Sequence, residues 1–183
     1  MVVWGFVQSL NATKLEHLHV TGHEQCQPTS PGTVLDLPIL KVLSVSNMGL
    51  VYVNVSKLPL LERLCLRENL IGDVGNSLTN LSNLLFLDLT KNKLLKFPLL
   101  HPTSRIQVLK LADNQIHFIN GEYMYRLEHL KEIDLSGNYF TCNCDLVPFR
   151  KWVQLAKVYF VGINDYTCLD YHIHKKKYLL LDF

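Results

Sequence analysis

The sequence lacks a long apolar run. No stretch of its 183 residues approaches the roughly 18 consecutive apolar residues that a membrane-spanning helix requires. The first six residues have no basic flank, no extended apolar core and no clear cleavage site, so they do not look like a secretory signal peptide. We therefore expect the chain to be tied to a membrane only through segments that lie outside this sequence.

A large excess of either charge is also absent. The 18 Lys and Arg residues nearly balance the 16 Asp and Glu residues, for a formal net charge of +2, whereas nucleic-acid-binding domains usually carry a strong basic excess. The basic run at 175–177 has the character of a solvated surface. With 48% hydrophobic and 19% charged residues, the chain is expected to fold as a globular protein without contacting nucleic acid.

The short motifs of common catalytic sites are missing as well. The sequence contains no G-x-S-x-G turn, no glycine-rich phosphate loop and no H-E-x-x-H motif. Two carboxylates, Asp88 and Asp134, could face each other across the repeats described below, but no acid–base pocket follows from their positions. We therefore expect a protein that is not an enzyme and holds no cofactor and no metal.

What the sequence does have is an internal repeat. Six segments, called rows here, follow the pattern L-x-x-L-x-L-x-x-N-x-L and begin at Leu15, Leu40, Leu61, Leu84, Ile106 and Leu130. Successive starts are 25, 21, 23, 22 and 24 residues apart, within the period of about 20–29 that defines leucine-rich repeats. The ninth position holds, from the first row to the last, His23, Met48, Asn69, Asn92, Asn114 and Asn138.

Stacked rows of this kind predict a solenoid. The third to fifth positions of each row are expected to form a short strand whose fourth residue points inward and whose third and fifth residues point outward and are exposed. The ninth-position asparagine is expected to turn inward and bond backbone groups that the turn leaves unpaired. The sequence thus predicts an α/β leucine-rich-repeat solenoid with a parallel sheet on its concave face, in which residues 1–137 form about six rows with an incomplete N-terminal end.

A cysteine-containing segment follows the sixth row. Cys142 and Cys144 precede an apolar pattern over 146–156 that predicts a short amphipathic helix, and Cys168 follows it. Because the open end of a solenoid exposes core leucines, residues 138–183 are expected to form its cap. The alternative is a zinc site, although the C-x-C spacing is tighter than usual for one; its ligands would be Cys142, Cys144, Cys168 and either His172 or His174.

The C-x-C motif, the helix with Trp152 and the later cysteine resemble the C-terminal cap of extracellular leucine-rich-repeat proteins. Together with the uneven repeat lengths, they are most similar to the ectodomain of a Toll-like receptor over residues 15–183. The resemblance implies a disulfide between Cys142 and Cys168. It also implies that the partner of Cys144 lies beyond Phe183, so that the cap is truncated.

The resemblance further implies a function in innate immunity. Toll-like receptor ectodomains recognise microbial ligands, dimerise with a second receptor chain, and face the extracellular space or the endosomal lumen. Two alternatives are an antigen-binding protein of the variable lymphocyte receptor type, whose repeats are more uniform, and an adhesive matrix protein. The uneven spacing of the rows counts against the first alternative.

Three N-x-S/T triplets predict N-linked glycans, at Asn11, Asn54 and Asn80. Beside a cysteine cap, they favour passage through the secretory pathway. Asn54 and Asn80 follow the strands of their rows, so glycans there would leave the sheet face free.

The outward strand positions are the candidate contact surface. Phe86 and Val108 occupy the third position of neighbouring rows and form an apolar pair where an apolar residue is not required. We expect this pair to contact a ligand or a second chain, with Arg63, Asp88 and Lys110 around it.

Overall fold

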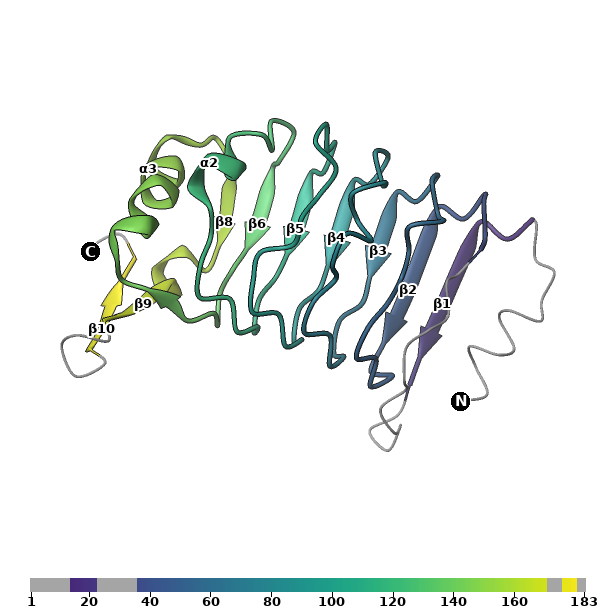
Figure 1. Cartoon of the computed structure of the whole chain (residues 1–183), viewed down its shortest axis with the longest axis horizontal. Coiled ribbons are helices and arrows are strands. Elements are labelled where there is room, and N and C mark those ends of the chain that lie inside the picture. Colours follow the sequence, from purple (N-terminus) through teal and green to yellow (C-terminus); the bar gives the residue numbers. More distant parts are fainter. Residues whose placement is uncertain (1–13, 23–35, 171–175, 181–183) are drawn as a thin grey trace.

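The rows are successive coils of one solenoid (Figure 1), in a computed structural model that describes residues 14–22, 36–170 and 176–180. Seven parallel strands form one sheet in the order β1-β2-β3-β4-β5-β6-β8. Their bounds are β1 (His17–Thr21), β2 (Val42–Ser46), β3 (Arg63–Cys65), β4 (Phe86–Asp88), β5 (Val108–Lys110), β6 (Glu132–Asp134) and β8 (Tyr159–Val161). The predicted leucine-rich-repeat solenoid is therefore confirmed.

The remaining elements lie mainly at the C-terminal end. They are α2 (Gly121–Met124), β7 (Phe140–Thr141), the 3₁₀ turn η1 (Cys144–Leu146), α3 (Val147–Leu155), the 3₁₀ turn η2 (Ile163–Asp165), β9 (Thr167–Asp170) and β10 (Lys176–Leu179). A second sheet has the order β10-β9-β7. Within the described residues, no helix has the length and apolar character needed to cross a bilayer.

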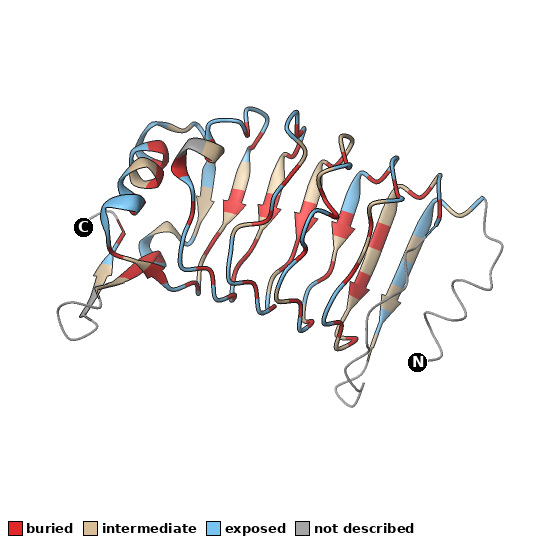
Figure 2. Ribbon diagram, in the orientation of Figure 1, coloured by how far each residue is buried: buried red, intermediate tan, exposed pale blue. Residues whose placement is uncertain are grey.

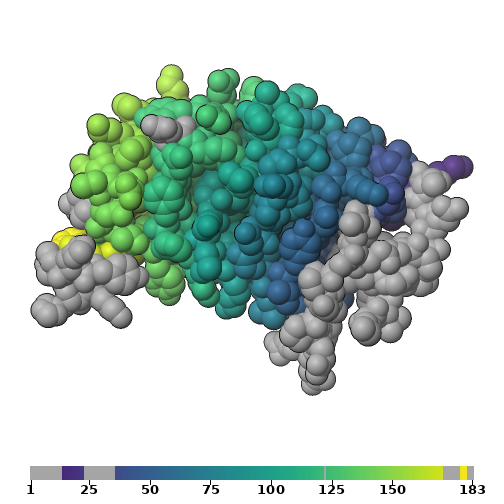
Figure 3. Space-filling view, in the orientation of Figure 1, coloured from purple at the N-terminus to yellow at the C-terminus, as the bar shows by residue number. Residues whose placement is uncertain are grey.

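The register of the sheet follows the repeat position for position. The third positions pair along the sheet from Val42 through Arg63, Phe86 and Val108 to Glu132. The space-filling view shows the rows as neighbouring bands in sequence order (Figure 3). Each row therefore contacts mainly the row before it and the row after it, which is typical of a solenoid.

The apolar positions of the repeat build one continuous core. The fourth-position residues of the second to sixth rows are fully buried, and Figure 2 shows this buried stripe running across the strands. In the first row, by contrast, Leu15, Leu18 and Val20 are only half-buried. The core is therefore complete from the second row onward, and the first row is its least protected edge.

The ninth-position asparagine joins neighbouring coils. In Asn92, Nδ2 donates to the carbonyl oxygens of Leu89 in its own row and Leu66 in the preceding row, at 3.0 and 2.9 Å. Its Oδ1 accepts from the N–H of Ile71 at 3.1 Å. The same set of bonds is made by Asn69, Asn114 and Asn138. One buried amide thus satisfies backbone groups of two coils, as the repeat predicts.

The residue before the ninth position adopts a left-handed backbone in each of the second to sixth rows. The φ angles are 52° at Asn47, 56° at Glu68, 55° at Lys91, 53° at Asp113 and 68° at Gly137. Four of the five carry a side chain, for which this conformation is unfavourable. It is held by a backbone bond to the next row, as in Glu68, whose N–H donates to the Thr90 carbonyl at 2.9 Å.

The expectation that every third and fifth strand position is exposed is wrong. Asp88 is buried, with 7% of its surface exposed, and its Oδ1 accepts from the N–H of Thr90 at 2.9 Å. Phe86, Val108 and Lys110 are half-buried. The physical reason is the spacing of about 4.8 Å between strands, which lets side chains of adjacent rows shield one another.

The cap closes the C-terminal end of the core with aromatic rings. Phe149 lies between Phe140 and Trp152, at centroid distances of 5.9 and 6.0 Å, and Trp152 meets Phe160 edge-on at 5.4 Å. Helix α3 can approach α2 because Gly121 has no side chain. A Cβ there would lie 2.3 Å from the backbone nitrogen of Phe149. The predicted helix exists, and β8 extends the sheet by a strand that the repeat pattern does not contain.

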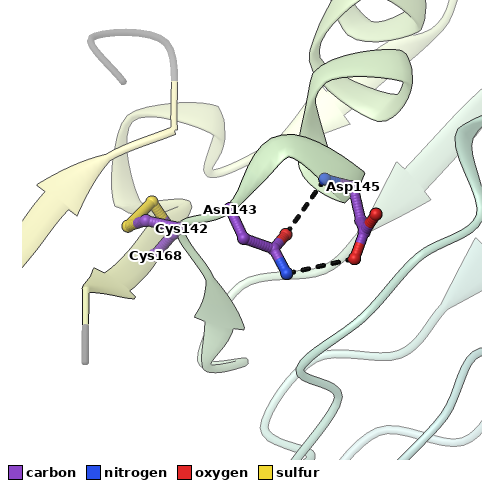
Figure 4. The surroundings of a disulfide bond; sticks show 4 residues. All are labelled: Cys142, Asn143, Asp145 and Cys168. Carbon is purple, nitrogen blue, oxygen red and sulfur yellow. Dashed lines mark hydrogen bonds between the residues drawn. A yellow bond between two sulfur atoms is a disulfide. The ribbon is translucent and has the colours of Figure 1, made fainter. Parts of the chain in front are cut away.

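Cys142 and Cys168 form the disulfide that the resemblance implies (Figure 4). The bond joins the residue after β7 to β9 in the second sheet. Beside it, Asn143 accepts a hydrogen bond from the N–H of Asp145 at 3.2 Å and begins η1. A zinc site with both of these sulfurs as thiolate ligands is therefore wrong, because they are bonded to each other.

A tyrosine hydroxyl completes the last coil. In the third, fourth and fifth rows, the sixth-position N–H donates to the fifth-position carbonyl of the next row. In the sixth row, the N–H of Leu135 donates instead to Tyr166 Oη at 2.9 Å, and that hydroxyl donates to the Ile133 carbonyl at 3.3 Å. Burial raises the pKa of Tyr166, so the hydroxyl stays protonated and able to donate.

Replacing Asn92 with alanine should lower the free energy of unfolding by about 1–3 kcal/mol, because at least one buried backbone group loses its partner. Denaturant unfolding of the purified protein measures the loss. The control is Asn76→Ala, since Asn76 is exposed. A change at Asn92 no larger than that of the control would contradict the bridging role.

Tyr166→Phe should destabilise the protein by a similar amount, about 1–3 kcal/mol, because the ring remains while the buried Leu135 N–H loses its acceptor. Thermal and denaturant unfolding both report on it. Tyr159→Phe serves as control, because Tyr159 is 68% exposed. Equal stability of the two variants would show that the hydroxyl does not close the coil.

Candidate ligand-binding face

The candidate site lies on the exposed side of strands β3, β4 and β5. Parallel pairing places Arg63, Phe86 and Val108 side by side, and it places Cys65, Asp88 and Lys110 in the neighbouring line. The structure therefore brings together all five residues expected to contact a ligand. Their order follows directly from the register of the repeats.

Arg63 and Phe86 form a stacked pair across two strands. The guanidinium carbon of Arg63 lies 4.1 Å from the centre of the Phe86 ring. A cation over an aromatic face is attracted by the negative potential of the ring. The pair combines a planar positive group with an apolar surface, and Val108 extends that surface by one row.

Charged groups border the apolar pair. Lys110 Nζ lies 3.5 Å from Glu132 Oε1, and both side chains are about one-third exposed, at 37% and 32%. Cys65 is a half-buried free thiol whose Sγ lies 4.0 Å from Asp88 Oδ2. Asp88 is fixed by its bond to Thr90, so it acts as a structural acceptor on this face.

The candidate face combines apolar area with charges of both signs. Arg63 lies over the Phe86 ring, and Lys110 is paired with Glu132. Among the described residues, no three His, Cys, Asp or Glu side chains gather closely enough to hold a metal ion.

No protein-family model matches the chain. Over 111 residues it is 32% identical to human Toll-like receptor 2, a match that covers 57% of this chain and 14% of that protein. Over 102 residues it is 29% identical to the Danio rerio protein Transforming growth factor beta activator LRRC33, covering 55% of this chain and 15% of that protein. The match thus spans about one-seventh of the length of these relatives.

A solved structure supports the fold. The chain superimposes with a TM-score of 0.55 on a chain of the octameric complex of Latrophilin 3, Unc5D and FLRT2, at 17% sequence identity, over 74% of this chain and 48% of that one. The chain is a leucine-rich-repeat module that is similar, over part of its length, to Toll-like receptor 2. Its disulfide and its relatives support an extracellular location. Neither relative is named as an enzyme.

The expected glycan sites of this module differ in their surroundings. Asn80 is exposed. Asn54 is half-buried, and its Oδ1 accepts from the Ser56 N–H at 3.1 Å and from the Ser56 hydroxyl at 2.7 Å. Asn11 lies outside the described residues.

Of the cysteines outside the disulfide and the sheet face, Cys26 also lies outside the described residues, and Cys144 is an exposed free thiol.

Two pockets away from the sheet face were not anticipated from the sequence. One, of about 330 Å³, is lined by Pro102, Thr103, Ser104, Tyr125, Arg126, Glu128 and His129. The other, of about 260 Å³, is mainly apolar and is lined by Lys96, Phe97, Leu99, Phe118, Asn120 and Tyr123. The signal for the second was present in the apolar residues beside the repeat positions in the fourth row, such as Leu95 and Leu99.

When the chain is produced in eukaryotic secretory cells, glycosidase treatment should increase its gel mobility, because Asn54 and Asn80 both lie in acceptor triplets. Asn54→Gln and Asn80→Gln should each remove one step of that shift. Asn76→Gln, outside any triplet, is the control and should leave the shift unchanged. Identical migration of treated and untreated protein would rule out modification at both sites.

Proposed function

We propose that this chain is a recognition module of an innate immune receptor of the Toll-like kind, binding a microbial ligand or a second receptor chain through its sheet face. The observation that carries the proposal is the apolar pair Phe86–Val108 with Arg63 stacked on it. The 32% identity to Toll-like receptor 2 supports the class of receptor.

The sheet face supplies the energetics that such recognition needs. Phe86 is already held by Arg63, so little side-chain freedom is lost when a partner covers it. The guanidinium presents several fixed N–H donors, which suit a carboxylate or phosphate group. A ligand with an apolar part over Phe86 and Val108 and an acidic part near Arg63 fits this surface.

In this proposal the remaining parts of the receptor do the signalling. Residues 1–137 supply the rows and 138–183 the cap, and dimerisation with a second chain would bring cytoplasmic signalling domains together. The ligand would be met at the cell surface or in the endosomal lumen. The alternatives of a lymphocyte-receptor-type antigen binder and of a matrix protein have no specific observation in their favour.

A protein ligand is the second candidate, because one relative is named as an activator of transforming growth factor beta. The same surface would serve, with an apolar side chain of the growth factor over Phe86. The two candidates differ in the probe that binds, so one set of variants distinguishes them.

Phe86→Ala in the intact receptor, expressed in reporter cells, should reduce the response to heat-killed bacterial preparations by about tenfold or more in potency, since a central apolar contact is lost. Arg63→Ala should have the same direction of effect. Leu155→Ala, on the exposed side of α3, is the control. The first probe is the bacterial preparation. The second is latent transforming growth factor beta, whose binding to the same variants is measured directly.

If neither Phe86→Ala nor Arg63→Ala changes the cellular response or the binding of the growth factor, the proposal is wrong. Loss of growth-factor binding alone would favour the second candidate. Thermal unfolding of each variant separates a lost contact from a lost fold, because Phe86 is half-buried.

A further inference from the structure

A second apolar surface lies off the sheet, between the coils of the fourth and fifth rows. We call the pocket lined by Lys96, Phe97, Leu99, Phe118, Asn120 and Tyr123 the flank pocket. Its residues come from the segments that leave β4 and β5 after the asparagine turn. It is therefore separate from the Phe86 face in both sequence and position.

The walls of the flank pocket are unusually exposed for apolar side chains. The exposed fractions are 54% for Leu99 and 43% for Phe118. These two side chains come from adjacent coils and line one concavity. Apolar groups gathered in this way on a folded protein mark an interaction surface more often than single exposed residues do.

The floor of the pocket is preformed. Phe97 and Tyr123 pack edge-to-face with ring centroids 5.8 Å apart. The Tyr123 hydroxyl accepts a hydrogen bond from the N–H of Leu100 at 2.6 Å, which fixes the ring against the preceding coil. An occupant therefore meets a rigid floor and does not have to order it, which favours binding.

One side of the pocket is positively charged. Lys96, which lines the pocket, is exposed and forms no ion pair with a carboxylate in the described ranges. Lys91, by contrast, lies 3.6 Å from Glu68 and is partly neutralised. The positive charge near the flank pocket is thus available to an incoming group of opposite sign.

The size of the pocket limits the occupant. Its volume of about 260 Å³ lies below the range of about 300–1,000 Å³ typical of sites that enclose a whole small molecule. A single large side chain, as in the anchors of protein interfaces, fits such a concavity. Lys96 then favours a negative charge beside that anchor.

We propose that the flank pocket receives one phenylalanine or leucine side chain from a partner protein, at a segment where carboxylates flank that side chain. The apolar walls hold the anchor, and Lys96 attracts the neighbouring carboxylates. This contact does not depend on ligand binding at the sheet face, so the receptor could hold both partners at once.

The test uses the whole chain and a fluorescein-labelled peptide, Asp-Glu-Phe-Leu-Glu-Asp with blocked ends. Fluorescence anisotropy should show saturable binding that weakens as salt is raised, since the attraction between Lys96 and the carboxylates of the peptide is screened by salt. The peptides Lys-Arg-Phe-Leu-Arg-Lys and Asp-Glu-Ala-Ala-Glu-Asp test charge and anchor separately. Both should bind at least about tenfold more weakly.

Protein variants locate the site. Phe118→Ala and Lys96→Glu should each weaken the binding of the acidic peptide by about tenfold. Lys96→Glu tests this without creating a cavity. Tyr139→Ala is the control, because Tyr139 is also an exposed aromatic residue, at 56% against 43% for Phe118, and lies outside the pocket. Phe86→Ala should leave peptide binding unchanged, which keeps this result distinct from the sheet-face proposal.

Three outcomes would overturn the assignment. The first is the absence of acidic-peptide binding at about 1 mM. The second is equal binding of the acidic and basic peptides, or binding that Phe118→Ala and Lys96→Glu leave unchanged. The third is Phe118-dependent binding to phosphatidylglycerol vesicles with none to the peptide, which would assign the pocket to a lipid surface.

Discussion

The buried asparagine of each row has to satisfy backbone groups of two coils at once, and the rest of the solenoid depends on that constraint. A tight turn leaves carbonyl and N–H groups pointing into an apolar interior, where an unpaired group costs about 1–3 kcal/mol. Asn92 satisfies these groups. Its Nδ2 donates to the carbonyl oxygens of Leu66 and Leu89, and its Oδ1 accepts from the N–H of Ile71. Because one amide ties two rows together, the offset between rows is fixed, and the strands meet in register.

Register in turn creates the surface on which function is proposed. The same offset that aligns Leu64 with Leu87 inside the coil aligns Arg63 with Phe86 outside it. The stacked pair is therefore a product of core geometry, although neither residue belongs to the core. The left-handed residues Glu68, Lys91 and Asp113, each before an asparagine, serve the same geometry. Their unfavourable backbone persists because each donates its N–H to a carbonyl of the next row.

Much of this architecture could be predicted because the same pattern of apolar residues occurs six times in the sequence. The strand positions, the inward asparagines and the cap helix all followed from spacing and apolar period. Asp88 escaped prediction because its burial depends on neighbouring rows and on the Thr90 N–H, which the repeat does not encode. Strand β8 and Tyr166 escaped because they match no row, and a tyrosine hydroxyl can bond many groups. The flank pocket had a visible signal in Leu95 and Leu99, but apolar residues beside a core position predict packing as readily as a binding surface.

The bond that Tyr166 makes to Leu135 has a consequence for how such a molecule changes in length. The cap bonds the backbone of the final coil, and each asparagine bonds only its own coil and the coil before it. None of these contacts depends on the total number of coils. A whole coil could be gained or removed between the fourth and sixth rows by duplication or deletion, with every remaining amide meeting an equivalent neighbour. The sheet face would then lengthen or shorten while both ends stayed unchanged, so that solenoids of one architecture can differ in the area of their sheet face.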